Sequence, residues 1–285
     1  MPADNVHLNG RLLPAPEARI SVFDAAVMHG ASVFTTMLAR NGVVFRLDRH
    51  LARLMDTAAR MRLRSDATAE SLAAATGELI EANALSDARV RITLSPGGTR
   101  GNEPSPTTTL ITTEPLPEYP TEWYRDGIAV VVSSFRQFRG DPLGGYKTGC
   151  YFPRVLARQE AAGKGAEEAL WFTQENYLAE ACFCNVFLVL GGRVCTPPLE
   201  TPVLPGIVRE AVLELCSSLG VSCEAKTPLT VREMLAAEEM FLTASCSGVR
   251  PVVRVERHAV GEEKPGPVTR RVMAAYEELL KKECG

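Results

Sequence analysis

Three short segments of this chain hold the residue types that could do chemistry together. Residues 146–151 (YKTGCY) set Lys147 among small residues just before a helix-like run. Residues 177–187 (YLAEACFCNVF) place Glu180 between two apolar, strand-like stretches. Residues 204–209 (LPGIVR) predict a tight turn that opens a helix. Together the segments offer a nucleophilic amine, an isolated carboxylate and a helix N-terminus suited to an anion.

Pyridoxal 5′-phosphate (PLP) needs this combination of groups. Its aldehyde takes a lysine, its pyridine nitrogen takes a counter-charge, and its phosphate takes backbone N–H donors. Gly144, Gly145 and Gly149 would let the backbone and the cofactor approach each other closely. Glu180 stands in a segment that is otherwise apolar or small, where an unpaired carboxylate is costly and a protonated pyridine nitrogen would stabilise it. We therefore predict a PLP site, while a solvated lysine, a strand-edge charge and an ordinary helix start are the plainer alternatives.

The composition is that of an ordinary globular chain. Its 285 residues, 46% hydrophobic and 23% charged, can bury the core of one large domain or two smaller ones. The formal net charge is −3 and no basic block stands out, so we expect no nucleic-acid partner. No apolar run approaches the roughly 18 residues that would span a bilayer, and the N-terminus lacks the features of a secretory signal. We therefore predict a cytoplasmic protein without a membrane partner.

The eight cysteines are scattered without the spacing of a disulfide framework. Cys182 and Cys184 are separated by one residue rather than the two usual in zinc knuckles, and the chain has only four histidines. We therefore predict reduced thiols and no metal site.

Hydrophobic patterns predict an α/β chain of two domains. In the N-terminal part they predict Asn-Gly hairpin turns at 9–10 and 41–42. They also predict a helix from about 48, a second helix at 66–84 and a strand at 88–94. In the C-terminal part they predict strands at 128–134, 168–173, 186–190 and 239–243, and helices at 152–162, 208–218 and 267–282. The most proline-dense stretch lies between them and predicts an interdomain linker at 117–126. The result is a smaller N-terminal α/β domain, 1–116, and a larger C-terminal mixed α/β domain, 127–285.

The chain resembles the class IV (fold type IV) PLP-dependent aminotransferases, which include branched-chain aminotransferases, D-amino acid aminotransferases and 4-amino-4-deoxychorismate lyases. The resemblance runs from the Asn9-Gly10 hairpin to about Val252. The matching segments are 45–54 (FRLDRHLARL), the Lys147 segment, 180–185, 196–198, 204–209 and 239–243. The resemblance implies a two-domain α/β fold with PLP at the domain interface, and a homodimer in which partner loops complete the pocket.

Carried over residue by residue, the resemblance implies a role for each matching position. Lys147 would form the imine bond to the cofactor, and Glu180 would pair with the pyridine nitrogen. Tyr151 would contact the cofactor's phenolic oxygen. The phosphate would be bound by Arg53, the N–H groups of Ile207 and Val208, and Ser245. Two positions depart from the family pattern, because Val208 replaces a common threonine and Cys150 replaces a common asparagine.

The residues that would choose the substrate fit no single branch of the family. Branched-chain enzymes usually carry a tyrosine where His29 precedes a glycine, and D-amino acid enzymes share an Arg-x-His pair that the loop around Arg100 lacks. The run at 97–101 (GGTRG) and the Phe-Thr-Thr sequence at 34–36 look more like the lyases. Arg100 is well placed to bind a substrate carboxylate, although a solvated loop arginine is the alternative. The predicted substrate-binding residues are Arg100, His29, Thr35, Cys246 and Ser247.

We expect transamination of a small amino acid to its 2-oxo acid, of the branched-chain or D-amino acid type. The alternative is elimination of pyruvate from 4-amino-4-deoxychorismate, which leaves 4-aminobenzoate. A third hypothesis is a non-catalytic PLP-binding protein, which the intact set of Lys147, Glu180 and Arg53 disfavours. In both enzymatic hypotheses Lys147 is the catalytic residue, because the amine freed from the cofactor lies within reach of the proton to be moved.

Overall fold

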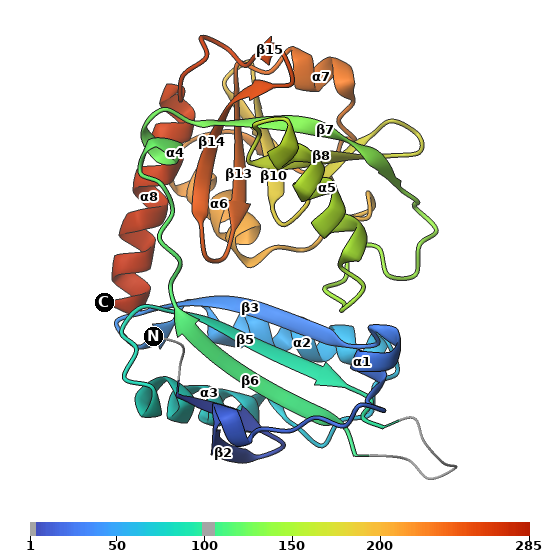
Figure 1. Ribbon diagram of the computed structural model, residues 1–285. Helices are drawn as coiled ribbons and strands as arrows, with labels where there is room; N and C mark the ends of the chain where they lie inside the picture. The colour runs from blue at the N-terminus through green and yellow to red at the C-terminus, as the bar shows by residue number, and fades with distance from the viewer. Residues whose placement is uncertain (1–3, 99–105) are drawn as a thin grey trace. The chain divides into compact units, whose positions relative to one another are not determined.

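The computed structural model describes residues 4–98 and 106–285, and the chain divides into two compact units (Figure 1). The first unit comprises Met1–Pro117, Lys147–Cys150 and Leu280–Gly285, and the second comprises Glu118–Tyr146 and Tyr151–Leu279. Each unit is built around its own sheet, which confirms the predicted α/β class. The four residues that begin with Lys147 belong to the first unit, although the chain on both sides of them belongs to the second.

The first unit is an antiparallel sheet with helices packed on it (Figure 1). Its strands follow the order β2-β1-β6-β5-β3-β4. They are β1 (Asn5–Leu8), β2 (Arg11–Pro14), β3 (Val33–Arg40), β4 (Val43–Val44), β5 (Ala88–Ser95) and β6 (Thr108–Pro115). Its helices are the short 3-10 helix η1 (Ala15–Glu17), α1 (Ala25–His29), α2 (Leu47–Arg60) and α3 (Ala69–Ala82).

Both predicted Asn-Gly hairpins are confirmed, joining β1 to β2 and β3 to β4. Asn9 and Gly10 have φ angles of 50° and 79°, and Asn41 and Gly42 have 51° and 77°. Asparagine and glycine adopt this left-handed region more easily than other residues, so the sequence selects these turns. Strand β6 was not predicted, because its threonine-rich sequence has no clear apolar alternation and runs into the proline-dense stretch.

The core of the first unit forms where two helical stripes meet the alternating strand β5. Leu51 and Leu54 of α2 and Leu72 and Leu79 of α3 are buried in one cluster with Ile92 of β5. Burying a leucine contributes roughly 1.5–3 kcal/mol, so this packing rather than helix propensity holds α2 in place. The helix predicted from position 48 is thereby confirmed, and its apolar stripe orients the helix that carries the predicted phosphate-binding arginine.

The segment that contains Lys147 is fixed by backbone hydrogen bonds to the start of β3. The Phe34 N–H donates to the Lys147 carbonyl at 2.9 Å, and the Gly149 N–H donates to the Ser32 carbonyl at 2.7 Å. A Cβ at position 149 would lie 2.6 Å from the Gly30 carbonyl oxygen, closer than any real side chain allows. Glycine is therefore needed at position 149, where the backbone lies close to the segment before β3. The residues around Lys147 have small side chains because their backbone lies against a strand.

The second unit is a larger mixed sheet with the strand order β12-β11-β10-β13-β14-β7-β8-β9, to which β15 adds beside β14 (Figure 1). The strands are β7 (Ile128–Gln137), β8 (Glu168–Thr173), β9 (Leu178–Ala181), β10 (Asn185–Leu190), β11 (Arg193–Cys195), β12 (Cys223–Glu224), β13 (Glu239–Ala244), β14 (Gly248–Val255) and β15 (His258–Ala259). The helices are α4 (Glu122–Arg125), α5 (Phe152–Gly163), α6 (Ile207–Ser218), α7 (Val231–Leu235) and α8 (Pro267–Cys284).

Parallel pairing in the centre of this sheet dictates where its helices go. Strand β7 is parallel to both β8 and β14, and parallel neighbours need a crossover connection, which α5 supplies between β7 and β8. Strand β8 is buried at every position, as expected for a strand covered on both faces. In the described part of the chain, no helix has the length and apolar character required to cross a membrane.

Glu239 ties the sheet of the second unit to the start of its longest helix. It lies in β13 with 7% of its surface exposed, and its carboxylate accepts from the N–H groups of Val268 at 3.0 Å and Thr269 at 2.7 Å. These are two of the first N–H groups of α8, which have no acceptor within the helix. A strand carboxylate therefore acts as the N-terminal cap of α8.

We predict that Glu239→Ala lowers the free energy of unfolding by about 1–3 kcal/mol, because it leaves buried donors unsatisfied. Chemical denaturation followed by tryptophan fluorescence measures this effect, since Trp123 and Trp171 both belong to the second unit. Glu175→Ala is the matched control, because Glu175 is an exposed turn residue. Equal loss in both variants would show that the carboxylate does not cap the helix.

Candidate active site

The Lys147 side chain lies beside an aromatic ring of its own unit. Its Nζ is 4.8 Å from the centroid of the Phe34 ring, and the residue is half-buried. Its backbone is bonded to β3. A lysine whose main chain is held by a sheet and whose amine lies over a ring is preorganised in a way that an ordinary surface lysine is not.

Arg53 of α2 is positioned by two buried residues. Its Nη2 donates to the Thr35 hydroxyl at 3.3 Å, and the same hydroxyl lies 2.9 Å from His50 Nδ1. Thr35 has no exposed surface and His50 has 1%. The predicted substrate-binding threonine and the predicted phosphate-binding arginine are therefore in contact, and both are joined to a histidine that sequence analysis did not single out as a site residue.

The electrostatics of this cluster fix the protonation of His50. Burial, together with the positive charges of Arg53 and Lys147, holds the pKa of His50 well below its ordinary value. The imidazole is therefore neutral near pH 7. Since the Thr35 oxygen accepts from Arg53, the Thr35 hydroxyl can donate its own proton to His50 Nδ1, which leaves the ring proton on Nε2.

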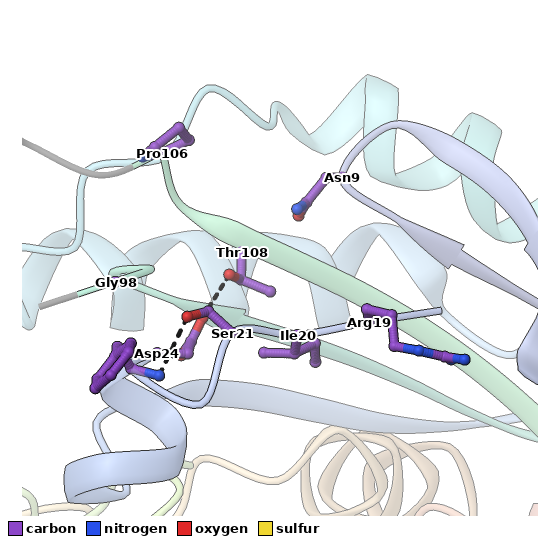
Figure 2. Close-up of a pocket in the computed structure, with 9 residues that line it drawn as sticks. Asn9, Arg19, Ile20, Ser21, Asp24, Gly98, Pro106 and Thr108 are labelled. Carbon is purple, nitrogen blue, oxygen red and sulfur yellow. Dashed lines mark hydrogen bonds between the residues drawn. The ribbon is translucent and has the colours of Figure 1, made fainter. Parts of the chain in front are cut away.

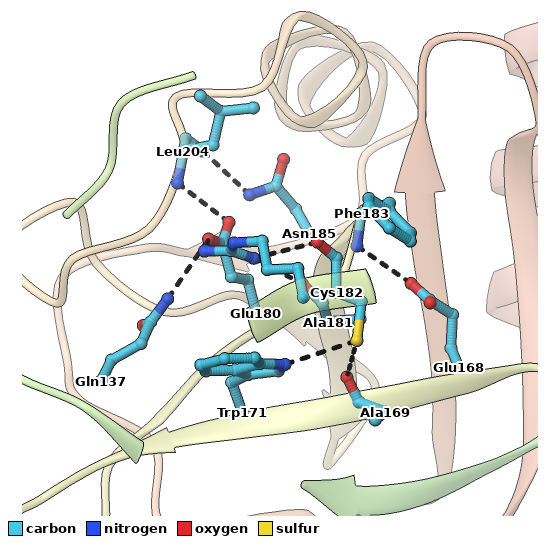
Figure 3. A network of polar contacts seen from close by, with 11 residues as sticks. Gln137, Glu168, Ala169, Trp171, Glu180, Ala181, Cys182, Phe183, Asn185 and Leu204 are labelled. Carbon is cyan, nitrogen blue, oxygen red and sulfur yellow. Dashed lines mark hydrogen bonds and ion pairs between the residues drawn. The ribbon is translucent and has the colours of Figure 1, made fainter. Parts of the chain in front are cut away.

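Glu180 lies in β9 with 5% of its side chain exposed, and its carboxylate is engaged at both oxygens by the chain itself (Figure 3). Arg154 Nη2 lies 2.5 Å from Glu180 Oε1, and the Leu204 N–H donates to Oε2 at 3.0 Å. The sequence predicted that a cofactor nitrogen would stabilise the Glu180 carboxylate. The protein itself supplies a second cationic partner, the Arg154 guanidinium. Sequence analysis missed Arg154 because no motif links the first turn of α5 to β9.

The N-terminus of α6 lies in the same unit and has no side-chain cap. The helix follows Gly206, which supplies no side-chain cap, and its first residues Ile207 and Val208 are 5% and 2% exposed. Their N–H groups have no acceptor within the helix, so an anion such as a phosphate would satisfy them. The predicted helix start is confirmed.

A single residue, Leu204, links this helix start to Glu180. The Leu204 N–H is bound by Glu180, and the Leu204 carbonyl accepts from Asn185 Nδ2 at 2.8 Å (Figure 3). A side chain at Gly206 would collide with Asn185 Oδ1, so the turn packs directly on β10. The Glu180 carboxylate and the N-terminus of α6 are therefore held at a fixed separation.

The remaining predicted residues of the second unit lie in two places. Tyr151 immediately precedes α5, and its ring stacks on Phe183 with centroids 5.7 Å apart. Ser245, Cys246 and Ser247 form the turn between β13 and β14. The Tyr124 hydroxyl donates to the Ser247 carbonyl at 3.0 Å and steadies that turn.

Two predicted substrate contacts belong to the N-terminal part of the chain. His29 is the exposed last residue of the five-residue helix α1 in the first unit. Arg100 lies outside the described residues. Both remain predictions.

The first unit also has a cavity of about 340 Å³ (Figure 2). None of the described residues that line it is a predicted site residue. Its carboxylate, Asp24, accepts from the Ala26 N–H at 2.8 Å and from the hydroxyls of Ser95 and Thr108, each at 2.5 Å. Burial raises the pKa of Asp24, but the Ser95 and Thr108 hydrogen bonds outweigh it and the pKa is lowered overall. This carboxylate caps α1 and holds two strands, which is a structural role.

The model of the amino-transferase class IV family matches residues 32–255, and the chain belongs to this family. The branched-chain-amino-acid aminotransferase of Escherichia coli K12 is 30% identical, covering 96% of this chain and 92% of that protein. A crystal structure of the E. coli enzyme has a TM-score of 0.93 and covers 99% of this chain and 96% of that one at 29% identity. The D-alanine aminotransferase of Bacillus licheniformis is 28% identical, with 98% of both chains covered.

The cofactor follows from the same comparisons. A second branched-chain amino acid aminotransferase, from T.th., was solved with pyridoxamine 5′-phosphate. It has a TM-score of 0.92 at 28% identity and covers 99% of this chain and 95% of that one. Class IV aminotransferases use PLP, and this chain is a PLP-dependent transaminase. Its own residues fit the group, because the chain supplies a lysine, a buried carboxylate and a helix N-terminus without a side-chain cap.

We predict that Arg53→Ala weakens PLP binding by about 10- to 100-fold, the equivalent of a charge-assisted hydrogen bond of roughly 1.5–3 kcal/mol. Titration of the apoprotein with PLP measures this affinity. Arg49→Ala is the matched control, because Arg49 is an exposed arginine one turn earlier on α2. An unchanged affinity for Arg53→Ala would exclude it from the phosphate site.

Proposed function

We propose that the chain transfers the amino group of a branched-chain or D-amino acid, with Lys147 and Glu180 acting on the reactive part of PLP. The observation that supports this best is the buried Glu180 carboxylate, held through the Leu204 peptide to a helix N-terminus without a side-chain cap. An anionic group beside an anion-binding end fits a cofactor that is cationic at its ring nitrogen and anionic at its phosphate. PLP supplies the electron sink that stabilises charge left on the substrate carbon.

In this proposal Lys147 binds the cofactor and then carries the proton. Its amine must be unprotonated to accept a proton from the substrate carbon, and a position over the Phe34 ring keeps it close to a fixed site. The same amine then donates the proton on the cofactor side, because it stays within reach of both atoms. One residue therefore serves as base and then as acid.

The other residues bind rather than react. We assign the phosphate to Arg53, to the N–H groups of Ile207 and Val208, and to Ser245. Tyr151 is assigned to the cofactor's phenolic oxygen. Because Val208 has no hydroxyl, the helix end contributes only backbone donors, which gives the arginine more of the phosphate charge to neutralise.

Substrate binding is assigned to Arg100, His29, Cys246 and Ser247. Thr35 is fully buried and engaged with His50 and Arg53, so we propose that it acts on the substrate side only by orienting Arg53. Transamination is favoured over elimination because the similar proteins named above are branched-chain and D-alanine aminotransferases.

A half-reaction without an amino acceptor tests the proposal. PLP-loaded protein is incubated separately with L-leucine, D-alanine and 4-amino-4-deoxychorismate, and the absorbance and products are followed. We expect L-leucine or D-alanine to yield one equivalent of 2-oxo acid per chain and to convert the cofactor to its pyridoxamine form. Lys147→Ala should yield none, whereas Lys164→Ala, which changes an exposed lysine, should behave as wild type. Catalytic release of pyruvate and 4-aminobenzoate would instead establish the lyase.

We also propose that the protein is a cytoplasmic homodimer. Exposed apolar side chains gather at 20–28 of the first unit, with Val22, Val27 and Met28 having 68%, 61% and 53% of their surfaces exposed. Apolar clusters of this kind commonly mark a subunit contact. We predict that sedimentation gives twice the 30.9 kDa chain mass and that Val27→Glu shifts the protein toward a single chain. A monomeric wild-type protein would contradict the proposed homodimer. Fractionation of the source cells tests the proposed cytoplasmic location.

A further inference from the structure

Glu180 has a cationic partner within its own chain, and this bears on how strongly it can act on a cofactor. Arg154 Nη2 lies 2.5 Å from Glu180 Oε1. The arginine side chain is 19% exposed and the glutamate side chain 5%, so solvent screens this pair only weakly. A carboxylate that already balances one charge has less potential to offer a second cation.

The guanidinium is held in place by more than the glutamate. Arg154 Nη1 donates to the carbonyls of Ala181 at 3.1 Å and Cys182 at 3.0 Å. Its Cζ lies 5.3 Å from the centroid of the Trp171 ring and 5.8 Å from that of Tyr151. Arg154 is thus an anchored cation with a defined position.

Two titratable groups beside the carboxylate have shifted pKa values. Burial lowers the pKa of Arg154, but the Glu180 carboxylate and the Tyr151 phenol beside it outweigh that effect and raise the pKa overall, so the guanidinium stays charged. Burial raises the pKa of the Cys182 thiol to about 11, so it stays neutral. The side-chain oxygen of Gln137 accepts from Arg154 Nη2 at 3.0 Å, and its side-chain nitrogen donates to the Pro202 carbonyl at 3.2 Å.

Glu180 does not depend on Arg154 alone for its position. Its second oxygen is bound by the Leu204 N–H at 3.0 Å, and the carbonyl of Leu204 is held by Asn185. Removal of the guanidinium therefore leaves the carboxylate anchored by a backbone donor. Charge and position can be separated by mutation here, which makes the effect of the charge measurable.

We propose that Arg154 is a positioning residue that shares the Glu180 carboxylate with the pyridine nitrogen of PLP, so that the nitrogen holds its proton less tightly than an unshared glutamate would allow. This inference rests on the proposed role of Glu180 as partner of that nitrogen. The fixed positive charge opposes protonation of the ring, while the shared carboxylate favours it. Arg154 thereby limits how strongly the ring withdraws electrons, and sets the pH at which it gains its proton.

The test uses PLP labelled with ¹⁵N in its ring, bound to wild type, Arg154→Met and Arg154→Gln. The ¹⁵N chemical shift is followed with pH, because it reports protonation of the nitrogen directly and needs no turnover. We expect the midpoint to rise by about one pH unit or more in both variants, since the positive charge that would oppose protonation has been removed. Arg158→Gln is the matched control, because Arg158 lies one turn further along α5 and approaches Glu168 instead.

An unchanged or lower midpoint in both variants would overturn the proposal, because a purely structural arginine would release Glu180 and weaken its hold on the nitrogen. Failure of both variants to bind PLP would also overturn it, since it would make Arg154 an anchor and not a shared partner. Failure of the proposed function gives a different result. In that case Glu180→Gln would leave the wild-type titration unchanged, whatever the Arg154 variants did.

Discussion

One buried carboxylate joins several elements of the second unit. Glu180 is removed from water on β9, where an unpaired carboxylate is costly. Arg154 takes one oxygen, and the Leu204 N–H takes the other. Because Asn185 donates to the carbonyl of the same residue, Leu204 joins β9, β10 and the turn before α6. The proposed ring-nitrogen partner and the proposed phosphate-binding helix end are therefore parts of one hydrogen-bonded assembly.

In the first unit, two neutral residues, Thr35 and His50, orient the Arg53 guanidinium. Arg53 and Lys147 both raise the positive potential around His50, which stays neutral because it is also buried. A neutral histidine can accept from Thr35, which in turn accepts from Arg53, so a chain of uncharged groups directs the guanidinium. A neutral hydroxyl orients the Arg53 guanidinium without neutralising its charge, and this charge suits it to bind a phosphate.

Local patterns in the sequence predicted the hairpins, the α2 stripe, the buried strands and the residue types of the site, because each depends on neighbours within a few positions. Arg154 could not be predicted in this way, since its partner is 26 positions away and on another element. The contact of Thr35 with His50 and Arg53 was missed for the same reason. Grouping of Lys147–Cys150 with the first unit depends on pairing with β3, which residue spacing does not encode. The His50-x-x-Arg53 spacing on one helix was the one available signal for the histidine.

The central claim is that Glu180 is the group that keeps the cofactor's ring nitrogen protonated. The most direct measurement is the ¹⁵N chemical shift of ring-labelled PLP bound to wild type and to Glu180→Gln, compared at one pH near neutrality. The account predicts a protonated nitrogen in wild type and an unprotonated one in Glu180→Gln, with the cofactor still bound through its phosphate. The same protonated signal in both proteins would contradict it and would assign the buried carboxylate to structure alone.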